Sequence, residues 1–203
     1  MRTLILSLSS FAFVLISFKI KAQDSSQLFL TTGVGVITGA GQFGKAISPS
    51  LAFNSGIELK LSNKWYAQVQ IDFNSLQYDQ QIKDNNSPYL FRHTNSSLLL
   101  IGINSGYNIH SASKWFVSVY AGAGLVNVGE PRINFDNVNL IATQSVIRKT
   151  GFFGRAGTRL AYRTNSKLLQ TIFADVSYWG SPVKVQGGNV KGLSVYLGTR
   201  FGI

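Results

Sequence analysis

The chain has 203 residues, of which 19 are Lys or Arg and 8 are Asp or Glu, and it contains no cysteine. This length corresponds to one domain, and the lack of cysteine excludes a disulfide framework and a lipid attached to an N-terminal cysteine. Charged residues make up 13% of the chain, about half of the roughly 25% that is typical of soluble domains. The 20 glycines and 12% aromatic residues, beside only four prolines, favour β structure.

The first 22 residues predict a secretory signal peptide. Arg2 gives a positive start, the apolar run Leu4–Phe18 follows, and Ala22 precedes a polar stretch, which is the order of a cleavable leader. An uncleaved membrane anchor is the alternative, but the apolar run is shorter than the about 20 residues that a spanning helix needs. We therefore expect residues 1–22 to be removed and residues 23–203 to form the exported domain.

Removal of Arg2, Lys19 and Lys21 leaves 16 basic residues against 8 acidic ones, a net charge of +8. A basic surface can bind nucleic acid, but an exported chain rarely meets any, so we expect no such partner. The anionic headgroups of outer-membrane lipids and lipopolysaccharide are the candidate partners for this charge. A solvated basic surface without a specific partner explains it equally well.

Eight stretches between Leu28 and Ile203 alternate apolar and polar residues, as β-strands do. The gaps between them are alternately short and long, which is typical of barrels with tight turns on one side of a membrane and long loops on the other. We therefore predict an all-β fold, an eight-stranded antiparallel up-and-down transmembrane β-barrel. The predicted strands span residues 28–37, 50–61, 65–78, 94–108, 115–128, 149–162, 168–178 and 192–203.

Three of the short gaps resemble one another, because each is a polar turn that holds a serine and a lysine. They read Ser62-Asn63-Lys64, Ala112-Ser113-Lys114 and Asn165-Ser166-Lys167. The long gaps, residues 38–49, 79–93, 129–148 and 179–191, carry the Gly, Asn, Asp and Pro of loops. Since an even number of strands returns the chain to its starting side, we expect both termini and the short turns to be periplasmic.

The two faces of the strands differ in polarity. In the strand 65–78, Val69 and Phe73 share a face with Trp65, whereas Asp72 lies on the opposite, polar face. A soluble barrel would turn the apolar face inward, and a membrane barrel turns it to lipid. Trp and Tyr at one level mark a lipid–water interface, and we expect such a belt at Trp65, Tyr107, Trp115 and Tyr162.

The polar faces carry charges in mid-strand. The alternation places three acids and four bases in the lumen: Glu58, Lys60, Asp72, Arg155, Arg159, Asp175 and Arg200. Because an unpaired charge is costly in a dry interior, we expect these residues to form a network. A barrel of eight strands is wide enough only for its own side chains, so the lumen is expected to be filled. A narrow ion path along the charges is the alternative.

Several segments resemble the family of small eight-stranded outer-membrane barrels, the OmpA/OmpX-like domain in the form common in Bacteroidetes. The resemblance rests on the leader end Lys21–Gln23, the Ser-x-Lys-Trp-like turns, the glycine-rich strand 120–124 and the terminal strand 193–203. It implies location in the outer membrane of a Gram-negative cell and insertion by the barrel-assembly machinery. The implied assembly signal is Leu197, Phe201 and Ile203, with the departure that Phe201 stands two residues before the last residue, Ile203.

Some barrels of this kind are lipid A deacylases with a rim histidine, a serine two residues later and a glutamate on a neighbouring strand. Here His93 is followed at that spacing by Asn95, and Ser97 is four residues away. Residue types alone do not make a catalytic triad, so we expect no catalytic set. His110 stands in a turn without a metal-ligand spacing, and we expect neither a metal nor a cofactor.

The longest loop, 129–148, mixes charges with apolar residues, of which Ile133, Phe135 and Leu140 are the candidate partner contacts. They either bind another outer-membrane protein or pack on their own hairpin, which the alternation in residues 132–136 predicts. The preferred function is a non-enzymatic integral outer-membrane protein, either an accessory or interaction subunit or a structural component. The alternatives are a lipid-modifying enzyme of the lipid A deacylase kind and a narrow channel.

Overall fold

The computed structural model describes residues 28–80, 90–109, 114–136, 138, 141–166 and 168–203. The predicted signal peptide, His110 and Leu140 lie outside these residues. No helix in the described ranges has the length and hydropathy of a membrane span. The elements are β1 (Leu28–Gly39), α2 (Gly41–Gly44), β2 (Ile47–Ser48), β3 (Ser50–Lys60), β4 (Trp65–Tyr78), β5 (Thr94–Ile109), β6 (Trp115–Asp136), β7 (Ile141–Arg163), β8 (Leu169–Val185) and β9 (Gly188–Gly202).

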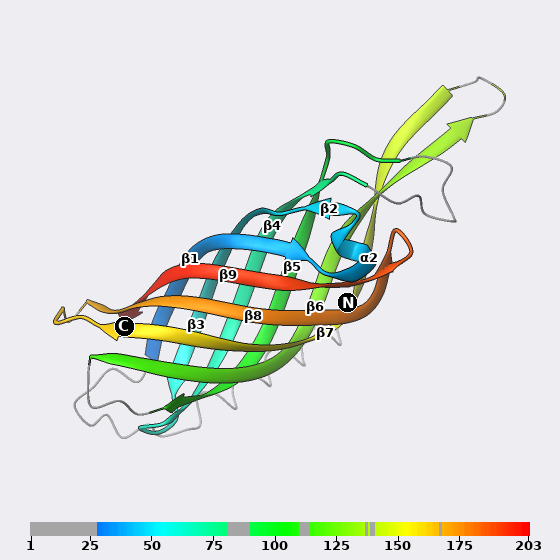
Figure 1. The fold of residues 1–203 in the computed structure, drawn as a ribbon. Helices are drawn as coiled ribbons and strands as arrows, with labels where there is room; N and C mark the ends of the chain where they lie inside the picture. Colours follow the sequence, from blue (N-terminus) through cyan, green and yellow to red (C-terminus); the bar gives the residue numbers. More distant parts are fainter. Residues whose placement is uncertain (1–27, 81–89, 110–113, 137, 139–140, 167) are drawn as a thin grey trace, which may run out of the picture.

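The strands form one antiparallel sheet that closes on itself (Figure 1). Its order is β2-β4-β3-β1-β9-β8-β7-β6-β5, and pairing of β4 with β5 completes the cylinder. The short β2 only adds to the end of β4, where Ile47 pairs with Tyr78. The cylinder therefore has eight long strands in the described part of the chain, and the predicted fold class is confirmed.

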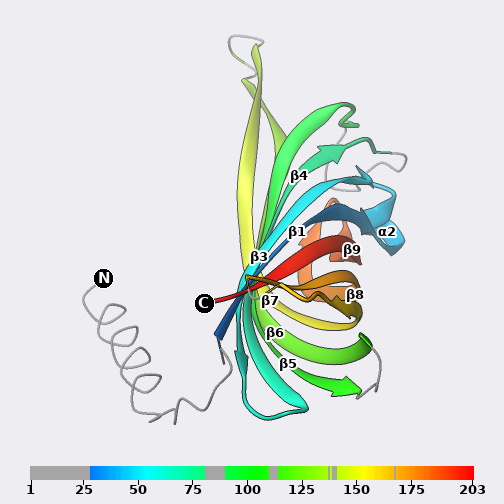
Figure 2. The same ribbon diagram turned by 90° about the vertical axis from the view of Figure 1, so that its left-hand side faces the viewer.

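Register defines the two ends of the barrel. At the turn end, β1 begins beside the last residues of β9, with Phe29 opposite Gly202. At the loop end lie α2 with β2, the β8–β9 turn and the β6–β7 hairpin (Figure 1). In Figure 2 the β6–β7 hairpin projects at the top and α2 lies on the right. The two ends therefore differ in construction as the alternation of short and long gaps predicted.

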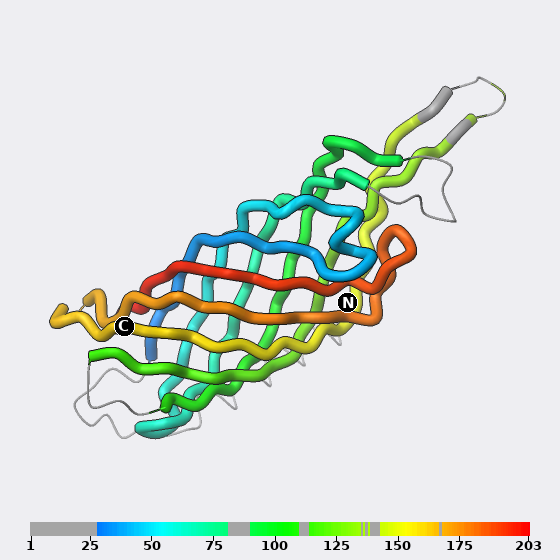
Figure 3. Tube along the Cα trace, in the orientation of Figure 1, coloured from blue at the N-terminus to red at the C-terminus, as the bar shows by residue number. Residues whose placement is uncertain are grey.

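The β6–β7 hairpin is longer than the alternating stretches 115–128 and 149–162 that predicted it. Its pairing continues past Val128 opposite Lys149 to Asp136 opposite Ile141. The neighbouring strands stop earlier, since β5 pairs with β6 only as far as Val128. The last part of the hairpin therefore projects as a two-stranded arm, the β6–β7 arm, which is the hairpin extension predicted for this loop (Figure 3).

The predicted loop 179–191 is wrong, because most of it is strand. β8 runs to Val185 and β9 starts at Gly188. The two residues between them have positive φ angles, 49° for Gln186 and 79° for Gly187, as a two-residue type I′ hairpin turn requires. The cluster of Gly, Ser and Pro at residues 180–182 resembles a loop in sequence, but here it forms an irregularity in the β8–β9 pairing.

The outer surface of the barrel is apolar and the inner surface is polar along the middle of the strands. In β4, Ile71 and Phe73 expose 45% and 50% of their surface, whereas Asp72 between them exposes 1%. A soluble protein buries its large apolar residues and exposes its charges. The inverted arrangement is that of a barrel whose outer face contacts lipid.

The lumen at the loop end differs from the predicted polar interior. A buried apolar cluster fills it, including Ile37, Leu100, Val126 and Trp179. Phe43 of α2 belongs to the same cluster, so the segment after β1 folds inward over this end of the barrel. Trp179, predicted in a loop, is fully buried and donates its indole N–H to Ser194 Oγ at 2.9 Å.

Candidate functional site

Arg159 on β7 is the centre of an ion-pair network in the lumen. Its Nε and Nη1 donate to Asp175 Oδ2 at 3.0 Å and Glu58 Oε2 at 3.1 Å. Its Nη2 donates to Gln68 Oε1 at 3.2 Å, so each nitrogen of the guanidinium has an acceptor. The network extends to Arg200, whose Nη1 lies 2.7 Å from Glu58 Oε1. It ties β3, β4, β7, β8 and β9 together across the interior.

A second network surrounds Asp72 on β4. Its Oδ2 pairs with Arg155, and its Oδ1 accepts hydrogen bonds from the amide groups of Asn54 and Gln70. Gln70 in turn accepts a 2.8 Å hydrogen bond from Asn104. The side chains of Asp72 and Arg155 are each 1% exposed. Hydrogen bonds to the remaining carboxylate lone pairs are what a buried ion pair needs to offset its desolvation.

The structure thus places six of the seven predicted lumen charges in two networks, with three carboxylates against three guanidinium groups. Lys60 is the exception. It is half-buried near the turn end and makes no ion pair with another described residue. The networks also recruit neutral partners that charge counting alone did not predict: Asn54, Gln68, Gln70, Asn104 and Tyr120.

The predicted belt residues lie in two cross-strand pairs. The rings of Trp65 and Tyr107 are 5.1 Å apart edge to face, and those of Trp115 and Tyr162 are 4.9 Å apart and tilted. Both pairs lie next to the short turns. Of the implied assembly signal, Leu197 and Ile203 are 65% and 67% exposed on the outer face.

A buried carboxylate at the loop end, Glu130, was missed at the sequence level. Glu130 is fully buried, accepts the backbone N–H of Gln186 at 2.7 Å, and pairs with Arg132 and Lys149 at 3.0 and 2.7 Å. It fastens the β6–β7 arm to the β8–β9 turn. Every second side chain of β6 points into the barrel, and this alternation reaches Glu130 two residues after Val128. The predicted strand ended at Val128, so Glu130 was assigned to the loop.

Of the candidate partner contacts of the β6–β7 arm, the structure describes the surroundings of Ile133. Ile133 is partly buried and packs against the apolar cluster of the loop end. Phe135 is in the arm, opposite Ala142, and Leu140 is outside the described residues. Val138 at the tip is 89% exposed. Of the two interpretations left open, packing on the protein itself therefore applies to Ile133.

His93 stands at the rim with a positive φ of 51°. Its Nδ1 lies 3.5 Å from the amide nitrogen of Gln77. Ser97 lies on β5 opposite Ser75 of β4. In the described part of the chain, no group of His, Asp, Glu or Cys has the arrangement of a metal site.

Comparison with known proteins bears on the fold. No protein-family model and no curated protein matches the chain. Neisserial surface protein A superposes with a TM-score of 0.61 at 14% identity, over 89% of this chain and all of that one. Ail of Yersinia pestis, solved with the heparin analogue sucrose octasulfate, gives 0.48 at 14% identity over 87% and 99%.

The N-terminal barrel domain of Pseudomonas aeruginosa OprF gives a TM-score of 0.45 at 13% identity, over 88% of this chain and all of that domain. At these identities the similarity concerns the fold alone. The superposition on Neisserial surface protein A shows that the chain has the architecture of a small outer-membrane β-barrel.

Replacement of Asp72 tests the ion pair in the lumen. Asp72→Leu leaves Arg155 buried without its carboxylate, and we expect the free energy of unfolding to fall by about 3–5 kcal/mol. The double variant Asp72→Leu/Arg155→Leu removes both charges and should recover most of this loss. Urea unfolding in lipid vesicles measures both, and a double variant as unstable as the single one would contradict the assignment.

Because Glu130 is a buried, ion-paired carboxylate, its ionisation should make the stability of the loop end depend on pH. Burial opposes ionisation, but the backbone N–H of Gln186 and the cations of Lys149 and Arg132 outweigh it, so the pKa of Glu130 lies below its usual 4.5. A lowered pKa contributes stability that is present above pH 4.5 and is lost as the pH falls through the folded-state value. We expect Glu130→Gln to melt several degrees below the parent at pH 7, since 1 kcal/mol corresponds to about 2–4 °C at this size.

The difference in melting temperature should shrink as the pH is lowered below 4.5, because the parent then loses the same charge. Asp79→Asn is the control, since Asp79 is a half-buried acid at the same end without an ion pair to another described residue. A constant difference between Glu130→Gln and the parent from pH 7 to pH 3 would contradict the assigned role of the carboxylate.

Proposed function

We propose that the protein is a non-enzymatic integral outer-membrane β-barrel that acts through its surfaces, as an interaction subunit of the membrane. In this proposal the loop end is extracellular and the turn end is periplasmic. A signal peptide over residues 1–22 and the barrel-assembly machinery would bring it there.

The filled lumen is the observation that carries this proposal. Two ion-pair networks occupy the middle of the barrel, and the apolar cluster with Phe43 occupies its loop end. An eight-stranded barrel has room for little more than its own side chains. Solute flow would have to separate buried ion pairs that are costly to leave unpartnered. A role on the surface therefore fits better than a narrow channel.

The β6–β7 arm is the surface best suited to a protein partner. Beyond Val128 its strands pair only with each other. At the base of the arm, the carbonyl groups of Gly129 and Pro131 accept hydrogen bonds from barrel side chains. The strand edges beyond Pro131 pair with no other described strand. Such edges are templates for pairing with another chain. The tip residue Val138 and the exposed Val146 add apolar contact area. We assign the interaction with another outer-membrane protein to this arm.

The loop end is also basic, which supports contact with lipopolysaccharide. Among the described residues, those exposed there include Lys45, Arg92, Arg148 and Lys184. The described acids at this end are Asp79, Glu130 and Asp136, and Glu130 is already paired with Arg132 and Lys149. Phosphate groups of the outer leaflet would neutralise the excess charge. This contact accompanies the proposed role and does not define it.

The rival proposal of a lipid A deacylase depends on an activated serine near His93. A serine nucleophile needs a base that is itself held by a third group. Among the described residues, the side chain within hydrogen-bonding distance of His93 is Gln77, which cannot act as an acidic orienting group. We therefore place the surface role ahead of the enzymatic one.

Single cysteines test the proposed orientation, because the chain has none of its own. Val138→Cys at the tip of the arm should react with a membrane-impermeant maleimide in intact cells. Asn63→Cys, in an exposed turn at the opposite end, should react only after the outer membrane has been permeabilised. Labelling in the reverse order would overturn the orientation, and mass spectrometry of the purified protein measures it.

A shortened arm tests the interaction role. Asn134 pairs with Thr143, so an Asn-Gly turn can replace residues 135–142 and close the hairpin with two residues. After extraction in mild detergent, we expect the parent to co-purify with a partner in fixed ratio and the shortened variant to lose it, with an unchanged melting temperature. The shortened variant keeps Glu130 and Ile133, so the base of the arm stays packed. Recovery of the parent barrel without a partner would contradict the proposal.

A further inference from the structure

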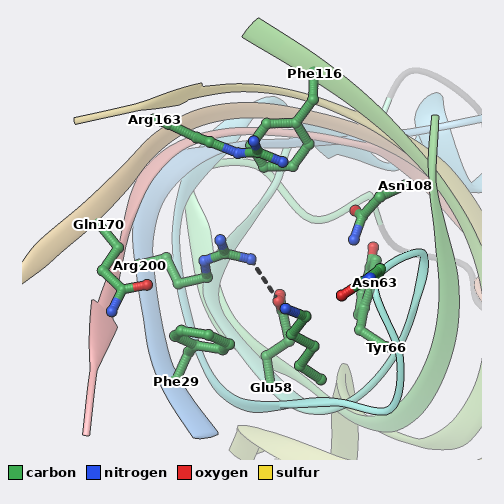
Figure 4. A pocket seen from close by; sticks show the side chains of 10 residues that line it. Phe29, Glu58, Asn63, Tyr66, Asn108, Phe116, Arg163, Gln170 and Arg200 are labelled. Atoms are coloured by element: carbon green, nitrogen blue, oxygen red, sulfur yellow. Dashed lines mark hydrogen bonds and ion pairs between the residues drawn. The ribbon is translucent and has the colours of Figure 1, made fainter. Parts of the chain in front are cut away.

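A pocket of about 380 Å³ opens at the turn end, below the network of Arg159. Its walls come from strands far apart in sequence, among them β1 with Phe29, β4 with Tyr66, β6 with Phe116 and β7 with Arg163 (Figure 4). Glu58 and Arg200, joined by their ion pair, also line it. The pocket is thus a chamber at the mouth of the barrel, and the proposed surface role does not use it.

The pocket carries an excess of positive charge. Both carboxylate oxygens of Glu58 are already engaged, one by Arg200 at 2.7 Å and the other by Arg159 at 3.1 Å. Lys60 and Arg163 also line the pocket, and neither pairs with an acid among the described residues. Two cations therefore face a cavity whose only carboxylate is neutralised, which favours an anionic ligand.

Aromatic rings hold the guanidinium groups at the pocket wall. The Arg163 guanidinium carbon lies 4.9 Å from the centre of the Phe116 ring, and that of Arg200 lies 4.5 Å from the centre of the Phe29 ring. Such contacts orient a planar cation and leave its edge for hydrogen bonding. A fixed guanidinium edge matches the two oxygens of a carboxylate.

Tyr66 supplies a second, independent indication of a ligand. Its side chain lines the pocket, the residue is 2% exposed, and its hydroxyl has no hydrogen-bond partner among the described residues. A buried hydroxyl without a partner costs free energy. A side chain at Gly106 would overlap the Tyr66 ring, so only a glycine at this position leaves room for the ring. A ligand with an acceptor group would complete this donor.

Side-chain amides distinguish a peptide from a simple anion. Asn63, Asn108 and Gln170 line the pocket, and the side-chain oxygen of Asn108 accepts a hydrogen bond from Ser118. An amide both donates and accepts, as does the backbone of a peptide, whereas phosphate at neutral pH mainly accepts. The amides beside the cations therefore favour a carboxylate carried on a peptide.

We propose that this pocket binds the carboxylate of a short acidic peptide segment, with Arg163 and Lys60 holding the anion and Tyr66 donating to it. The volume of the pocket lies at the lower end of the range for small-ligand sites, about 300–1,000 Å³, which suits one or two residues. The periplasmic origin of the peptide rests on the orientation proposed above, whereas the binding itself does not.

The test is titration of the barrel in lipid nanodiscs with acetyl-Gly-Glu-Glu-Gly amide, followed by calorimetry and by chemical shifts of the pocket residues. We expect Arg163→Gln and Lys60→Gln each to weaken binding about tenfold, equal to about 1.4 kcal/mol. Lys64→Gln is the matched control, because it removes the same charge at the same end from outside the pocket, and it should leave the affinity unchanged. Tyr66→Phe should weaken binding without lowering the melting temperature.

Acetyl-Gly-Gln-Gln-Gly amide, which has the same length without the carboxylates, is the control peptide. Three results would overturn the proposal: no binding by the parent barrel, equal binding of the control peptide, or equal effects of Arg163→Gln and Lys64→Gln. Inorganic phosphate provides a further comparison. If phosphate displaces the peptide at equal concentration, the pocket is a general anion site and the assignment to peptides is wrong. Because the titration does not involve the β6–β7 arm, its failure is distinguishable from failure of the proposed surface role.

Discussion

Pairing of β4 with β5 closes the sheet, and the rest of the structure follows from this closure. A closed sheet leaves no strand edge in the membrane, where an unpaired backbone group would be costly. It also fixes a narrow interior in which side chains from opposite walls meet. Glu58 and Arg159, 101 positions apart, form their hydrogen bond across this interior. Charges that would be hydrated in an open sheet must therefore neutralise one another.

The lumen meets this requirement in two ways along its length. In the middle, where the outer face is apolar, carboxylates and guanidinium groups pair and are completed by amides and by the Tyr120 hydroxyl. Towards the loop end, the interior becomes an ordinary apolar core beneath α2. The polar networks demand specific partners, whereas the apolar cluster needs mainly filled volume. Together they fill the described interior of the barrel with protein side chains.

The two ends offer different chemistry to the surroundings. The loop end presents the β6–β7 arm, whose base is held by Glu130 and whose edges beyond Pro131 pair with no other described strand. The turn end presents a small chamber with an excess of positive charge. The proposed protein contact at one end and the proposed ligand at the other are thus separated by a filled barrel. Any functional coupling between them would have to pass through the two ion-pair networks.

The sequence by itself determined most of the strands, their inner and outer faces and the aromatic residues beside the turns, because a period of two is a local property of the chain. It also placed Asp72, Arg155, Arg159 and Asp175 on the inner face. Only the tertiary structure decided which charges pair, that Glu130 joins the β6–β7 arm to the β8–β9 turn, and that the segment 180–191 is a hairpin. These features depend on register and closure, which bring together residues that no local pattern connects.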